Sequence, residues 1–128
     1  MAIQETESYY KTNLDLPNKL PPLDFTHSFG RLNRENEVLE IEYLNVGKHF
    51  NYIINIIPAK EELKLFSSKD KIPLKDGTQA AYYRTSRTNG NNLMTFMFKN
   101  NNWIYILSIE EGLIVNPLST LVEIANSL

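Results

Sequence analysis

Two acidic side chains with the spacing of a catalytic pair lie in a stretch that is predicted to form a β-strand. Glu40 and Glu42 are two residues apart within residues 38–44, so both carboxylates project from the same face of a strand. A carboxylate pair that cleaves a glycosidic bond needs one pKa to be raised by burial. The alternate positions, which include Leu39 and Ile41, are apolar, and this leaves the two glutamates on the solvent side. A small carboxylate-dependent hydrolase is therefore an alternative and not the leading hypothesis.

Other reactive residue types lack the spacing that catalysis or metal binding requires. The chain has no cysteine, which excludes disulfides and thiolate chemistry, and it has two histidines. His27 and His49 lie on separate predicted elements without a third ligand at a suitable spacing, so we predict no metal site. No serine lies in a nucleophile-elbow motif, and no glycine-rich loop is present to bind a phosphate. The sequence thus predicts no catalytic residue, no metal and no cofactor.

The composition is that of one ordinary globular domain. The chain has 128 residues, of which 42% are hydrophobic, and a formal net charge of −2. Neither the overall charge nor any basic run would neutralise phosphates, so nucleic acid is not an expected partner. No stretch is long and apolar enough to span a bilayer, and the first residues do not form a signal peptide. We leave the native N-terminus open, because an anchor could precede these residues.

Two strongly apolar runs near the C-terminus are predicted to form the centre of a sheet. Residues 93–98 and 103–109 are apolar on both strand faces, as in strands that are buried from both sides. The Asn-rich segment between them favours a hairpin, because Asn tolerates positive φ and bonds to its own backbone. Alternation places Trp103 and Tyr105 on the same face of the second strand.

Four more strands are predicted from the alternation of apolar and polar residues. In the first of them Phe25, His27 and Phe29 share one face, and the strand ends at Gly30. The other three strands span residues 38–44, 50–57 and 78–84. Residues 60–70 are ambiguous between one helical turn and a loop.

A C-terminal helix is predicted to cover the sheet. Asn116 and Pro117 have the residue types of an N-cap and a first helical position. The apolar stripe that follows consists of Leu118, Leu121, Val122, Ala125 and Leu128. We therefore predict that residues 20–128 form a single α+β domain, a mainly antiparallel sheet of about six strands with this helix packed on one face. Residues 1–19 are predicted to be a linker or an N-terminal helix.

Aromatic and guanidinium side chains on the predicted strands are the candidates for a binding face. Such groups contact partners well, although each one considered singly is more often part of the core. The candidate residues are Phe25, Phe29, Tyr82, Tyr83, Arg84, Trp103 and Tyr105.

The order of short motifs along the chain resembles an uncharacterised extracytoplasmic domain family of Firmicutes. These motifs are LPPL at residues 20–23, DGTQAAYY at 76–83, WIYILSI at 103–109 and LVEIANSL at 121–128. The family is similar in layout to the curved-sheet domains of the periplasmic lipoprotein carrier and of a sigma-factor regulator. The resemblance implies a curved sheet, a position outside the cytoplasmic membrane behind a signal peptide or anchor, and no catalytic residues. The chain is shorter than those carriers and has one convincing helix, which argues against a deep lipid cavity.

Together these features predict a non-enzymatic extracytoplasmic binding or regulatory module that is tethered to the membrane in its native form. The expected partner is another protein or an apolar or envelope ligand. An immunity-type protein that binds one cognate protein is a further alternative. The sequence leaves the ligand, the partner and the oligomeric state open.

Overall fold

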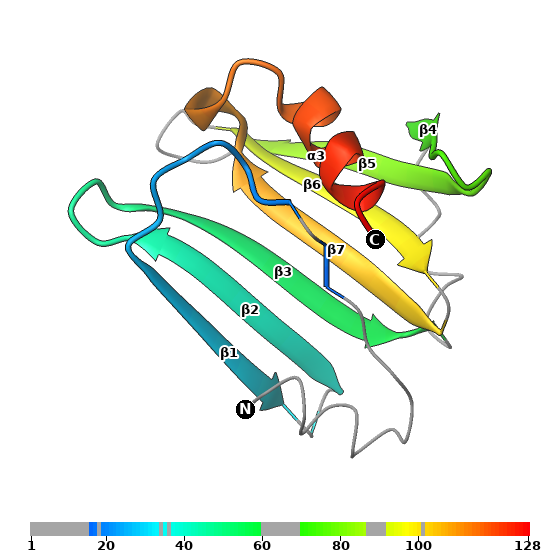
Figure 1. Cartoon of the computed structure of the whole chain (residues 1–128), viewed down its shortest axis with the longest axis horizontal. Helices are drawn as coiled ribbons and strands as arrows, with labels where there is room; N and C mark the ends of the chain where they lie inside the picture. Colours follow the sequence, from blue (N-terminus) through cyan, green and yellow to red (C-terminus); the bar gives the residue numbers. More distant parts are fainter. Residues whose placement is uncertain are drawn as a thin grey trace.

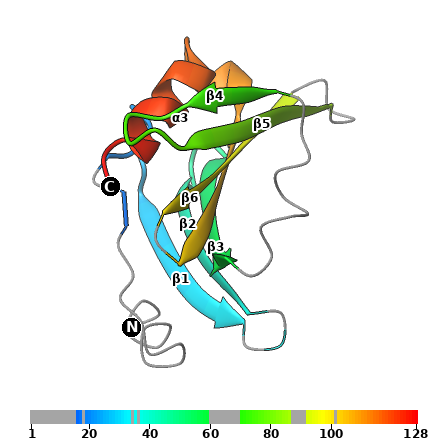
Figure 2. The ribbon, with the colours of Figure 1, turned by 90° about the vertical axis from the view of Figure 1, so that its right-hand side faces the viewer.

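The computed structural model describes residues 16–17, 19–33, 35, 37–59, 70–86, 92–100 and 102–128. It confirms an α+β architecture, in which an open, curved antiparallel sheet is followed by a C-terminal helix (Figures 1 and 2). The strands are β1 (His27–Asn33), β2 (Val38–Asn45), β3 (Phe50–Pro58), β4 (Lys71–Pro73), β5 (Gln79–Ser86), β6 (Asn92–Asn100) and β7 (Trp103–Glu110). The helices are the 3₁₀ helix η2 (Glu111–Leu113) and the α-helix α3 (Pro117–Ala125).

The sheet consists of two antiparallel meanders that meet at its centre. Strands β1 to β3 form one meander and β4 to β7 the other, and β3 pairs with β7 in the order β1-β2-β3-β7-β6-β5-β4. The sheet therefore has seven strands and not about six. The additional strand is β4, whose three residues are too few to show an alternating pattern. Residues 60–69, which the sequence leaves ambiguous, lie outside the described residues.

The β6–β7 hairpin is buried on both faces, as its sequence predicts. On the face that α3 covers, Phe96 pairs with Leu107, and both are 0% exposed. Ile54 continues this row on β3 with 2% exposure. On the opposite face Met97 and Ile104 are also buried. The hairpin thus forms the centre of the sheet, and the burial of its apolar side chains on both faces stabilises the fold.

Helix α3 begins where the sequence predicts and ends earlier. Pro117 occupies the first helical position, where its missing N–H costs nothing. Asn116 is the N-cap residue, but its side chain makes no capping hydrogen bond. The helix ends before the predicted Leu128, because the hydroxyl and the N–H of Ser127 both donate to the carbonyl of Ile124, at 2.6 and 3.1 Å. The buried residues of the helix are Leu121, Ile124 and Ala125.

The first strand is displaced from its predicted position. It begins at His27 and continues past Gly30 to Asn33. Thr26 interrupts the ladder, because its N–H and its hydroxyl both donate to the carbonyl of Leu44, at 2.8 and 3.2 Å. Residues before this point therefore do not follow the alternation of the strand.

Phe25 consequently lies on the opposite side of the sheet from Phe29. Its ring contacts the rings of Tyr43, Phe50 and Tyr52, with centroids 5.7, 6.0 and 6.3 Å away. These contacts place Phe25 against the hydrophobic core. The prediction that Phe25 shares a face with Phe29 is therefore wrong, and the irregular backbone at Thr26 is the reason.

Candidate functional site

Strand β1 has an outer edge that no other described strand pairs with (Figure 1). Six of its seven residues are exposed. At the other end of the sheet, β4 is a three-residue strand that contains Lys71 and Pro73, and short length, lysine and proline all protect an edge from further pairing. We call the outer-face side chains of β1 and β2 beside the open edge the β1 edge surface. It consists of His27, Phe29, Arg31, Glu40 and Glu42.

Phe29 is the apolar centre of the β1 edge surface. Its side chain is 60% exposed, which is unusual for an aromatic ring on a strand. The ring stacks on His27 at 6.5 Å between centroids and an interplanar angle of 16°. Across the ladder Phe29 pairs with Glu42, so an apolar ring lies beside a carboxylate.

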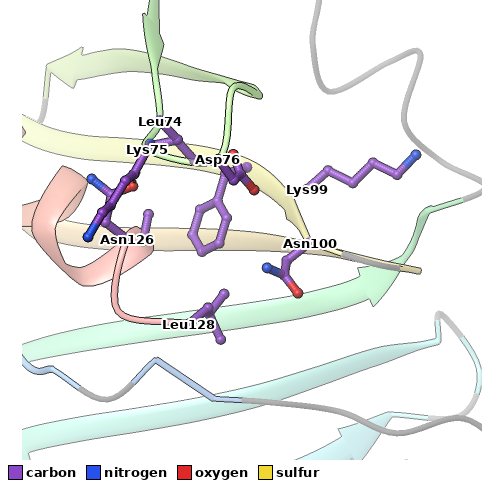
Figure 3. Close-up of a pocket in the computed structure, with 9 residues that line it drawn as sticks. Leu74, Lys75, Asp76, Lys99, Asn100, Asn126 and Leu128 are labelled. Atoms are coloured by element: carbon purple, nitrogen blue, oxygen red, sulfur yellow. Dashed lines mark hydrogen bonds between the residues drawn. The ribbon is translucent and has the colours of Figure 1, made fainter.

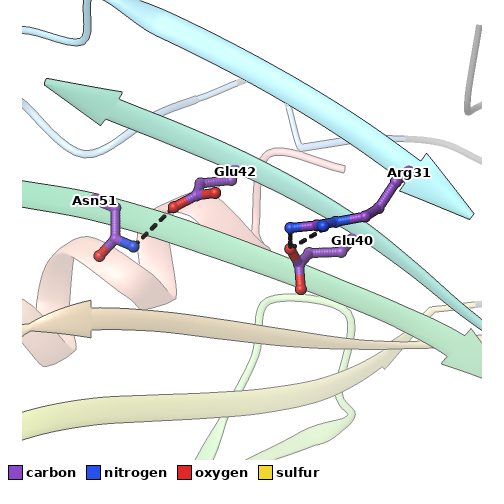
Figure 4. A network of polar contacts seen from close by, with 4 residues as sticks. All are labelled: Arg31, Glu40, Glu42 and Asn51. Carbon is purple, nitrogen blue, oxygen red and sulfur yellow. Dashed lines mark hydrogen bonds and ion pairs between the residues drawn. The ribbon is translucent and has the colours of Figure 1, made fainter. Parts of the chain in front are cut away.

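The charged groups of the β1 edge surface are held by specific partners (Figure 4). Arg31 donates to Glu40 Oε1 from Nη2 at 2.8 Å and from Nε at 3.2 Å. Glu42 Oε2 accepts from the side-chain amide of Asn51 at 2.8 Å. The surface therefore presents one neutralised ion pair and one acid that is bonded to a neutral amide.

Glu40 and Glu42 lie on one face, as the strand alternation predicts, but each has a different partner. A hydrolase needs two carboxylates that converge on a common cavity. Neither glutamate lines the two pockets described below. The two carboxylates therefore do not converge on either of these pockets.

The seven residues predicted as one binding face are divided between two faces of the sheet. Phe29 and Tyr83 lie on the outer face and are 60% and 42% exposed. The other five belong to the side of the core, and these are Phe25, Tyr82, Arg84, Trp103 and Tyr105. Trp103 and Tyr105 are only 2% and 1% exposed, so a ligand cannot reach them in the folded state. The candidate face thus reduces to Phe29 on the edge strand β1 and Tyr83 on β5, the second strand from the other edge.

Arg84 borders a groove between the β4–β5 strands and α3. Its Nε lies 2.7 Å from Glu111 Oε2. The groove has a volume of about 600 Å³, and Ile72, Leu118 and Val122 supply apolar contacts in it. Its polar lining residues are Arg84, Asn116, Ser119 and Glu123.

A smaller pocket lies at the C-terminal end of α3 (Figure 3). Its volume is about 300 Å³, with Phe98 and Leu74 among its apolar lining residues. Lys99 also lines it, but its amine points away from the pocket (Figure 3). The backbone N–H of Lys75 donates to Asn126 Oδ1 at 2.9 Å, which fastens the β4–β5 turn to the end of the helix.

Replacement of Asn126 by alanine is expected to lower the free energy of unfolding by about 1 kcal/mol, because this tertiary hydrogen bond is lost. Urea unfolding of the variant and the wild type measures the difference. Asn100→Ala is the matched control at the same pocket, since Asn100 takes no part in this bond and should change stability by less than about 0.5 kcal/mol. Equal effects of the two substitutions would show that the bond to Lys75 does not fasten the turn.

The two histidines lie in different parts of the sheet. His27 is on β1, where its Nδ1 is 2.9 Å from the hydroxyl of Thr26. His49 is in the β2–β3 turn with a positive φ of 58°. Within the described residues no three His, Cys, Asp or Glu side chains lie together as metal ligands. The described part of the chain also contains no helix that is long and apolar enough to cross a membrane.

Comparison with known proteins assigns no family to this chain. No family model matches the chain, and the searches of curated proteins and of solved structures return no match.

Arg31 is the residue of the β1 edge surface that the sequence interpretation omitted. The predicted first strand ends at Gly30 and therefore does not include Arg31. The alternation of Phe29, Arg31 and Asn33 could have extended the strand. No sequence signal indicates that this strand lies at an edge.

Proposed function

We propose that this protein is a non-catalytic binding module that takes up an extended segment of a protein at the open edge of β1. The observation that carries the proposal is a seven-residue strand, exposed at six of its residues and without proline, at one end of an antiparallel sheet. The backbone N–H and C=O groups along such an edge can pair with an added strand.

The side chains beside the edge would select the segment. Phe29 supplies an exposed aromatic anchor, and rings of this kind contribute strongly to binding when a partner desolvates them. Glu42 lies next to that ring, and Arg31 is neutralised by Glu40. The surface therefore suits an added strand whose side chains on the outer face of the sheet are apolar or basic where they lie near Phe29.

We further propose that the native protein performs this role outside the cytoplasmic membrane, tethered by a segment that precedes the present chain, in a regulatory setting. The resemblance to the Firmicute domain family supports this part of the proposal. An immunity-type role would use the same edge with one cognate protein. The carboxylate-dependent hydrolase has less support, because Arg31 and Asn51 already bond Glu40 and Glu42.

The proposal predicts that short peptides add to the sheet at β1. Peptides of about eight residues, long enough to match one strand, can be selected against the protein from a displayed random library. Selected peptides should protect the β1 amides from hydrogen exchange and should bind at least about tenfold more weakly to Phe29→Asp, because that change removes the apolar anchor and adds a charge beside Glu42.

Val115→Asp is the matched control for this experiment. Val115 is an exposed apolar residue, 93% exposed, in the segment between η2 and α3. The substitution should leave peptide binding unchanged. Peptides that protect α3 or β4 in place of β1 would show that the binding surface lies elsewhere.

A further inference from the structure

We infer that the strand that adds to β1 is β1 of a second copy of this chain, in antiparallel orientation with Gly30 at the two-fold axis. This inference rests on the proposed function and names the partner of the same edge. It follows from the register that the sequence of β1 allows and from the charges beside it.

Only a few registers keep the two sheets continuous with matching faces. Residues that face each other across an antiparallel pair point to the same side of the sheet. For the outer face of one copy to continue as the outer face of the other, two facing residues must both have odd numbers or both have even numbers, so their sum is even. A pair centred on Arg31 places two arginines opposite each other, which is unfavourable. In a pair centred on Phe29, the end of one β1 strand lies opposite Thr26 and Phe25 of the other copy, where the backbone is no longer part of the regular strand. The pair centred on Gly30 matches all seven residues, His27 to Asn33, with their counterparts.

The Gly30-centred register produces complementary side chains on the outer face. Phe29 lies opposite the partner's Arg31, and the same contact occurs a second time by symmetry. The aliphatic part of an arginine side chain packs well on an aromatic ring, and its guanidinium is attracted to the ring face. The partner's Arg31 can keep its ion pair with the partner's Glu40, because that glutamate lies on the side away from the edge.

Each outer row of the joined sheet would then read acid, aromatic, arginine, acid. It runs from Glu42 through Phe29 to the partner's Arg31 and the partner's Glu40. No like charges are directly opposed in either row. On the other face Ser28 lies opposite the partner's Leu32, and the two Gly30 residues meet at the axis without side chains. The edge can therefore pair with itself without opposing like charges, and each aromatic ring meets an arginine side chain.

The test is the oligomeric state of the full chain as a function of concentration, measured by sedimentation equilibrium. We expect a reversible dimer in the wild type. Phe29→Lys should weaken it by about tenfold or more, because it opposes two cations at each symmetric contact and removes the aromatic ring. Within one copy the new amine lies beside Glu42, so the fold should be retained, and circular dichroism checks this.

Val115→Lys makes the same change at an exposed apolar site away from β1 and should leave the dimer unchanged. Hydrogen exchange of the wild type gives a second readout that needs no variant. Amides of β1 should become more protected as concentration rises, and those of β4 should not.

A chain that stays monomeric at all concentrations would overturn the second-copy inference, and the peptide selection would still test the edge itself. A dimer that Phe29→Lys does not weaken, or one without protection of β1, would overturn the inference as well. Peptides that compete with a β1 dimer would support both proposals together.

Discussion

Replacement of Trp103 by alanine is expected to lower the free energy of unfolding by about 3–5 kcal/mol, because the largest side chain of the core is removed. Trp103 is 2% exposed and begins β7, where it pairs with Pro58 of β3 and Asn100 of β6. The remaining cavity would lie at the junction of the two meanders. Urea unfolding followed by far-ultraviolet circular dichroism measures the loss.

Phe29→Ala is the matched control, since it also truncates an aromatic side chain that the sequence placed on the candidate binding face. Phe29 is 60% exposed, so the change should alter the free energy of unfolding by less than about 0.5 kcal/mol. If Trp103→Ala were as mild as Phe29→Ala, Trp103 would not be the core residue that the structure describes.

A loss of stability in alkali is expected from Tyr52. Burial raises the pKa of its phenol far above the ordinary value of 10.0, and the neighbouring Tyr43 raises it further. The unfolded chain would release this proton at about pH 10, whereas the folded chain keeps it. The contribution of this group to the free energy of unfolding is therefore fully present below the pKa of Tyr52 in the unfolded chain. It declines as the pH rises from there toward the pKa of Tyr52 in the folded chain. The slope is about 1.4 kcal/mol per pH unit for this one group.

Tyr52→Phe should remove this part of the alkaline loss. The phenol oxygen is buried without a hydrogen-bond partner among the described residues, so its removal should also raise stability at neutral pH by about 1 kcal/mol. Urea unfolding of both proteins between about pH 8 and pH 11 covers the titration of a free tyrosine. Equal slopes for the two proteins would mean that Tyr52 ionises in the folded state as it does in the unfolded chain. Burial also raises the pKa of Tyr43, and its contribution should remain in the variant.

Local sequence signals predicted most of the elements of the sheet and the start of the helix. Alternation identified the core face of β2, the presence of β3 and both buried faces of the β6–β7 hairpin, because side chains on a strand repeat every two residues regardless of their partners. Pro117 marked the first residue of α3, since proline costs nothing at that position. These features depend on residues that are close together in the chain.

The irregular features of the sheet were not predicted. Thr26 shifts the start of β1 through bonds to Leu44, which is distant in sequence. That shift places Phe25 against the core, on the opposite side of the sheet from the exposed Phe29. The strand β4 was missed because three residues carry no periodicity, although pairing with β5 is enough to order them in the sheet.

The candidate binding face shows most clearly what the sequence determines and what the tertiary structure determines. The sequence by itself determined which residue types lie on the strands and which alternate together, and these are properties of covalent geometry and local hydrophobic pattern. Only the tertiary structure decided that Trp103 and Tyr105 are buried in the core while Phe29 lies beside an open edge. The reason is that the order of strands in a sheet is set by long-range pairing and by burial against other layers, and neither is encoded in any short stretch of the chain.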